Sequence, residues 1–110
     1  MGIIHIVMFG FKPLATPEEV QQVCSGMLAL KDKCIHPQTN KPYLKTSVGG
    51  ADSSPEGRQH GISHAFLSEF ESQEDRKYYI EKDPAHLEFV KSVDGIVEKI
   101  QVVDFTPGVF

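Results

Sequence analysis

The stretch that most constrains the fold is residues 3–11, IIHIVMFGF, which is apolar at nearly every position. Its β-branched and aromatic residues favour a strand, and a strand with apolar side chains on both alternating faces is typical of one covered on both sides. His5 is the one polar side chain in this stretch, and it shares a face with Val7 and Phe9. A small chain has few helices with which to cover a sheet, so we expect a second copy to cover one side.

The length of 110 residues fits one domain, which we assign to residues 1–110. The net charge is -4 and no basic block stands out, which argues against a nucleic-acid partner. No apolar run approaches the roughly 20 residues that span a membrane, and no cleavable signal precedes residue 16. We therefore expect a cytoplasmic protein without membrane contact, in which Cys24 and Cys34 are reduced thiols.

Helix openings are marked at three places. Thr16-Pro17-Glu18-Glu19 combines an N-cap, a proline at the first helical position and a capping-box glutamate, and apolar residues follow at helical spacing to about residue 34. Ser72 with Asp75 predicts a second helix, to about residue 81. Asp83-Pro84 then predicts a new helix start.

The remaining segments predict strands and a loop. We expect strands over residues 44–48, 61–71 and 96–105, and a loop over residues 49–57. The resulting order, β-α-β-β-α-β, is that of a ferredoxin-like α+β fold with an antiparallel sheet and helices on one face. Two such sheets packed face to face form a dimeric α/β barrel, so we expect a homodimer with a cleft between each sheet and its own helices.

His86 lies three residues after Asp83, in the first turn of the restarted helix. Backbone N–H groups point outward there and the helix dipole disfavours positive charge, so the imidazole is biased towards its neutral, proton-accepting form. It shares a helical stripe with Phe89, Val90 and Val93, so we expect the ring to end an apolar face. The alternative is a structural histidine whose ring bonds a loop carbonyl.

Three segments, HIVMFGFK, SHAFLSEFESQEDRKYYIEKDPAH and VVDFTPG, resemble the stress-responsive A/B barrel domain family, known as Dabb, over nearly the whole chain. The resemblance implies a dimeric α+β barrel without metal or organic cofactor. One member of that family, the plant polyketide cyclase olivetolic acid cyclase, performs an aldol condensation with a tyrosine and a histidine. These two residues fall on Tyr79 and His86, and two further histidines of the cyclase fall on His5 and His64.

The chain departs from that cyclase in ways that bear on the substrate. It has one extra residue between Tyr79 and His86, and Met27 stands where the cyclase has a pocket tyrosine. The loop over residues 34–60 is also longer, so the mouth of the pocket must differ. We expect the fold to transfer from the family better than the substrate.

These residues define the expected site. We predict His86 as general base and Tyr79 as acid, a pair that supports enolisation and aldol closure without a metal. We expect an apolar small molecule to contact five further residues: His5, His64, Phe66, Met27 and Phe89. A structural role for His5 and His64, one against the helices and one in the dimer seam, is the alternative. The histidine spacing carries no zinc motif.

Two other functions fit the same sequence. The cleft would bind an apolar metabolite in a stress response without converting it, and the histidines would only position that ligand. A barrel that handles haem through one axial histidine is the third reading. Turnover by the wild-type protein and by variants at positions 79 and 86 separates the enzyme from the binder, and a haem titration tests the third.

Overall fold

The computed structural model describes residues 2–110 and places them in four strands and three helices. The predicted order is confirmed, with the second helical region divided in two around Lys82 and Asp83. In chain order the elements are β1 (Ile3–Phe11), α1 (Pro17–Lys33), β2 (Leu44–Ala51), β3 (His64–Phe70), α2 (Gln73–Glu81), α3 (Pro84–Ser92) and β4 (Val97–Phe105).

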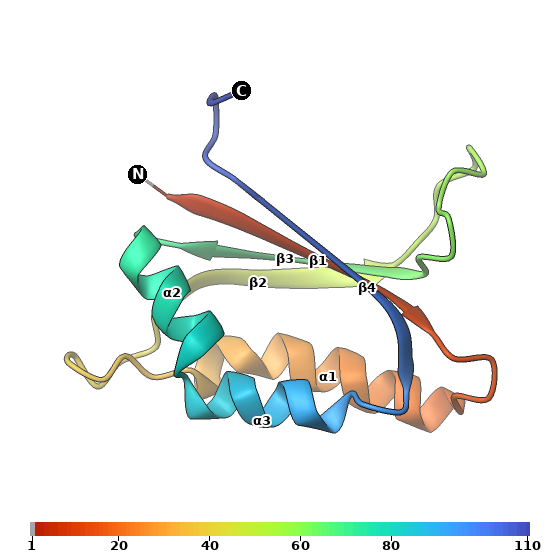
Figure 1. The fold of residues 1–110 in the computed structure, drawn as a ribbon, viewed down its shortest axis with the longest axis horizontal. Coiled ribbons are helices and arrows are strands. Elements are labelled where there is room, and N and C mark those ends of the chain that lie inside the picture. Colours follow the sequence, from red (N-terminus) through yellow and green to blue (C-terminus); the bar gives the residue numbers. More distant parts are fainter. Residues whose placement is uncertain (1) are drawn as a thin grey trace.

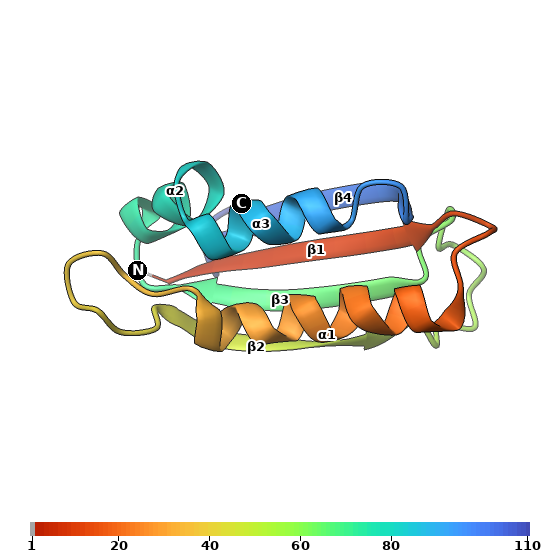
Figure 2. The same cartoon turned by 90° about the horizontal axis from the view of Figure 1, so that it is seen from below.

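The strands form one antiparallel sheet in the order β2-β3-β1-β4, which is the predicted ferredoxin-like topology. Figure 1 shows all three helices on one side of this sheet and none on the other. Seen from the helical side in Figure 2, α1 runs along β2 and β3, while α3 runs along β1 and β4. None of the helices within residues 2–110 is long and apolar enough to cross a membrane.

The predicted helix caps are present. The Thr16 hydroxyl accepts from the Glu19 amide at 3.1 Å, and the Glu19 carboxylate accepts from the Thr16 amide at 2.9 Å, which completes the capping box. The Ser72 hydroxyl caps α2 by accepting from the Asp75 amide at 3.1 Å. Asp83 caps α3, and Pro84 occupies its first position.

The core lies between the sheet and the helices. Val7 and Phe9 of β1 are buried against the apolar stripe of α1, which includes Met27 and Leu30. His5 is buried on this same face, as the alternation predicts. The opposite face of β1 carries Ile4, Ile6 and Met8, which are half-buried because no element of residues 2–110 lies over them.

The predicted loop over residues 49–57 is wrong for its first three residues. β2 continues to Ala51, because residues 48–51 pair in antiparallel register with residues 64–67 of β3. Gly49 suits this pairing, since a Cβ at that position would collide with the Phe66 ring. β3 in turn begins at His64, three residues later than predicted. Cross-strand pairing therefore outweighs the turn-like composition of GGA.

Candidate functional site

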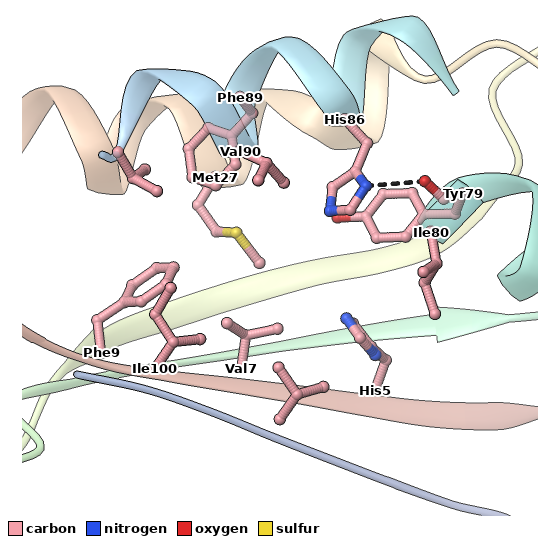
Figure 3. Close-up of a pocket in the computed structure, with 12 residues that line it drawn as sticks. His5, Val7, Phe9, Met27, Tyr79, Ile80, His86, Phe89, Val90 and Ile100 are labelled. Carbon is pink, nitrogen blue, oxygen red and sulfur yellow. Dashed lines mark hydrogen bonds between the residues drawn. The ribbon is translucent and has the colours of Figure 1, made fainter. Parts of the chain in front are cut away.

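A cavity of about 290 Å³ lies between the sheet and the helices, and we call it the cleft. Figure 3 shows β1 below it and α3 above it. Its lining is apolar except for His5, Tyr79 and His86, which gather at one end. The full lining comprises His5, Val7, Phe9, Met27, Tyr79, Ile80, His86, Phe89, Val90, Val93, Ile100 and Val102.

The cleft brings together most of the residues that the sequence singled out. Five of the predicted site residues line it: His5, Met27, Tyr79, His86 and Phe89. All four residues of the predicted apolar stripe, His86, Phe89, Val90 and Val93, line the cleft. Residues 81 positions apart in the sequence, on β1 and α3, thus meet at one polar end.

His64 and Phe66 lie outside this lining. His64 pairs with Phe9 rather than with His5, and its ring packs edge-on against Phe11 at 5.1 Å. Its Nδ1 bonds the Ser63 hydroxyl at 2.8 Å, and it borders a separate hollow beside the loop before β3. Phe66 is buried behind the cleft wall, where its ring packs on Phe9 at 5.8 Å.

His86 has one defined tautomer when it is neutral. Its Nδ1 lies 2.8 Å from the backbone carbonyl of Tyr79, and a carbonyl only accepts, so Nδ1 donates its proton there. The lone pair then resides on Nε2, which Figure 3 shows on the cleft side of the ring. Burial lowers the pKa of His86, partly opposed by the Tyr79 carbonyl. This is the direction predicted from the helix dipole, but its largest cause is burial.

Tyr79 is 1% exposed, and its ring stacks on the His86 imidazole with centroids 3.9 Å apart. Within residues 2–110, its hydroxyl is the one buried side-chain polar atom without a hydrogen-bond partner. Burial raises the pKa of Tyr79, and the neighbouring Cys34 and Asp83 raise it further. The phenol therefore keeps its proton at neutral pH and is equipped to donate a hydrogen bond.

His5 is held by a chain of charged groups that sequence reasoning missed. Its Nδ1 lies 2.6 Å from Oδ1 of Asp104, and Oδ2 of Asp104 accepts from Nη1 of Arg76 at 3.2 Å. His5 and Asp104 are direct cross-strand neighbours on β1 and β4. The carboxylate thus accepts a hydrogen bond from Nδ1 of His5 and leaves Nε2 as the one acceptor nitrogen of the neutral ring. The position of Asp104 in the apolar run VVDF could have singled it out in the sequence. Its pairing with His5, however, depends on the register between β1 and β4, which the sequence does not give.

No Lys, Arg, Asp or Glu of the described chain lines the cleft, so its histidines are the only ionisable basic groups in the lining. An anionic group deep inside would lack a Lys or Arg partner, and a buried unpaired charge is costly. Across residues 2–110, no group of three His, Cys, Asp or Glu is arranged to hold a metal ion. The geometry thus favours a neutral ligand with one polar end.

A family model and a related protein both connect this chain to the same family. The family model for the stress responsive A/B barrel domain, Dabb, matches residues 3–107. The chain is 33% identical to the stress-response A/B barrel domain-containing protein HS1 of Arabidopsis thaliana, over 94% of this chain and 87% of HS1.

Two solved structures extend the comparison. The hydroxynitrile lyase of Passiflora edulis superposes with a TM-score of 0.80 at 28% identity, covering 99% of this chain and 96% of the lyase. A dimeric ferredoxin-like protein from Thermobifida fusca superposes with a TM-score of 0.73 at 24% identity, covering 96% of this chain and 90% of that protein. The second likeness supports the fold.

Proposed function

The chain belongs to the stress responsive A/B barrel domain family, and we propose that it is a lyase or cyclase that makes or breaks a carbon–carbon bond by acid–base chemistry. Its substrate in this proposal is a small neutral molecule with a carbonyl or hydroxyl group. His86 acts as the base, and Tyr79 donates a hydrogen bond to the oxygen that becomes negative.

One observation carries the proposal. The Tyr79 carbonyl fixes the Nδ1 proton of His86, so a neutral imidazole presents a bare Nε2 to the cleft. Burial keeps that imidazole neutral, which a base requires, and the hydroxyl of Tyr79 stands unpaired beside it. A substrate oxygen would supply the partner that this hydroxyl lacks.

The proposed steps balance without an external reagent. In the bond-forming direction, Nε2 of His86 removes a proton from the carbon next to a carbonyl, and the enolate oxygen accepts a hydrogen bond from Tyr79. The enolate carbon then attacks a second carbonyl carbon. The new alkoxide receives the proton from the imidazolium, which restores neutral His86. In the reverse direction, His86 removes the hydroxyl proton and the carbon–carbon bond breaks.

The direction of cleavage has support from a relative. The Passiflora edulis protein of the same fold is a hydroxynitrile lyase. In such a cleavage a base removes the hydroxyl proton, the carbon–carbon bond breaks to give a carbonyl compound and cyanide, and cyanide takes the proton from the protonated base to leave as hydrogen cyanide, which uses the same acid–base roles. The cleft suits a compact apolar body next to the reacting group, since Phe9, Met27 and Phe89 line the end away from the histidines.

A turnover assay tests the proposal. Neutral hydroxynitriles and β-hydroxy ketones with aryl or branched alkyl groups are offered to the wild-type protein and to His86→Gln, with aldehyde release as the readout. We expect wild-type turnover that the variant loses, and weaker turnover of a substrate that carries a carboxylate on its apolar part. Binding of these compounds without any turnover would instead favour the non-catalytic metabolite-binding function.

We also propose that the protein works as a homodimer through the bare side of its sheet, which we call the open face. Ile6 lies at its centre, with Leu67 and Val103 as its direct cross-strand neighbours. Val103 is 53% exposed and Val48 on β2 is 56% exposed, so together with Ile6 and Leu67 they form a solvent-facing apolar patch. The dimeric relative from Thermobifida fusca has the same fold.

A further inference from the structure

The three helix caps within residues 2–110 differ in charge and in burial. Thr16 and Ser72 cap α1 and α2 with neutral hydroxyls at exposed or partly buried positions. Asp83 caps α3 with a carboxylate that is 1% exposed. A hydroxyl satisfies the same backbone donors, and a buried carboxylate carries a desolvation cost. Position 83 therefore places a buried negative charge at the start of α3, directly before the turn that carries His86.

The carboxylate of Asp83 is held on both of its oxygens. Oδ1 accepts from the amides of Ala85 at 2.9 Å and His86 at 3.4 Å, while Oδ2 accepts from the Tyr43 hydroxyl at 2.5 Å. Tyr43 reaches it from the segment just before β2. The buried Cys34 thiol also lies against this group, and burial followed by the charge of Asp83 raises the pKa of Cys34 to about 12.

We propose that Asp83 is a positioning residue for His86, which it fixes in place by accepting hydrogen bonds from the first amides of α3, and that Tyr43 holds the Asp83 carboxylate in place. The catalytic meaning of this proposal rests on the proposed role of His86 as base. Its physical content, a buried carboxylate bonded to the backbone amide of His86, stands independently of that role.

Four influences act on the His86 imidazole from the elements around it. Burial lowers the pKa of His86, the Tyr79 carbonyl on α2 raises it, His5 on β1 lowers it, and Asp83 at the start of α3 raises it. A base that is too strongly desolvated holds a proton too weakly to remove one from carbon. Asp83 offsets part of that desolvation while remaining outside the cleft lining, so it supports His86 without contacting substrate.

An NMR titration of the His86 imidazole tests the proposal without any substrate. The key variant is Asp83→Asn, since asparagine caps a helix as well as aspartate does but carries no charge. We expect the His86 midpoint to fall by about 0.5 pH unit or more in this variant. Thr16→Ala serves as the control, because it removes the cap of α1 and should lower stability without moving the His86 midpoint.

A folded Asp83→Asn protein whose His86 midpoint equals that of the wild type would overturn the proposal. Should Asp83→Asn fail to fold, Asp83→Ser repeats the test with the neutral hydroxyl cap that Ser72 already provides for α2. This test does not depend on the function proposed above, because the His86 midpoint can be measured even in a wild-type protein that has no activity. If the wild type is active, the acid limb of its pH-rate profile should shift in Asp83→Asn together with the NMR midpoint.

Discussion

The imidazole of His86 stacks on the phenol ring of Tyr79, with centroids 3.9 Å and planes 24° apart. The same two residues are linked a second time, because His86 Nδ1 bonds the Tyr79 backbone carbonyl at 2.8 Å. A ring held by both contacts has little rotational freedom. The break between α2 and α3 makes this possible, since it returns the chain so that residue 86 lies over residue 79.

Removal of the Tyr79 hydroxyl should lower activity without lowering stability. Because this buried hydroxyl has no partner, Tyr79→Phe should leave the free energy of unfolding unchanged or raise it by up to about 1 kcal/mol. The same change should lower kcat by roughly 100- to 1,000-fold, since the developing oxyanion loses its donor. Chemical denaturation and turnover assays measure the two effects. A clear loss of stability would show that the hydroxyl is paired in the folded protein.

The stability of the fold should depend on pH through His86. Its folded-state pKa lies below the ordinary value of 6.5, so the unfolded state binds more protons in mildly acidic solution. The contribution of His86 is therefore fully present above pH 6.5 and is lost as the pH falls from there through the folded-state pKa. Melting temperatures from pH 7.5 to pH 5 measure this for the wild type and His86→Gln. The decrease should be shallower in the variant, and parallel curves would contradict the shift.

The hydroxyl of Tyr43 should be important for stability because it satisfies a buried carboxylate. Tyr43→Phe leaves one oxygen of Asp83 without its donor, and we expect a loss of about 1–3 kcal/mol in the free energy of unfolding. Tyr78→Phe is a matched control, because its ring packs in the same aromatic cluster 5.9 Å from Tyr43. Equal stability losses in both variants would remove the special role of Tyr43.

The open face should determine the oligomeric state. Ile6→Lys places a charge between Leu67 and Val103, so we expect the dimer to dissociate at micromolar concentration. Leu14→Lys is the control, because Leu14 is 92% exposed in the loop between β1 and α1. Sedimentation or light scattering gives the mass of each protein. A wild-type monomer, or an Ile6→Lys dimer, would rule out this surface as the interface.

The sequence predicted the elements well where the signal is local. Caps such as Thr16 and Ser72 act within one helical turn, and apolar alternation in β1 depends on its own residues. The position of His86 on the cleft side was also predictable, because the Asp83-Pro84 opening and the helical stripe lie close to it in the chain, whereas Tyr79 was identified through the resemblance to the Dabb family. These signals determine which way a side chain faces.

The strand register and the contacts between residues far apart in the chain could not be predicted from the sequence. His64 was predicted to contact the ligand together with His5, but strand pairing places it beside Phe9, away from the polar end of the cleft. Asp104 and Tyr43 were missed for the same reason. Asp104 meets His5 across 99 positions, and Tyr43 meets Asp83 across 40. A period-2 pattern gives the face of a strand and leaves the position along it undetermined.

The most direct test of the account is proton abstraction by His86. The protein is incubated in deuterium oxide with a neutral aryl methyl ketone, and NMR follows the exchange of the protons next to the carbonyl. We predict exchange above the buffer rate with the wild type and with His64→Gln, and a loss of roughly 100-fold or more with folded His86→Gln. Equal exchange rates for the wild type and His86→Gln would contradict the central claim that His86 is a base facing the cleft.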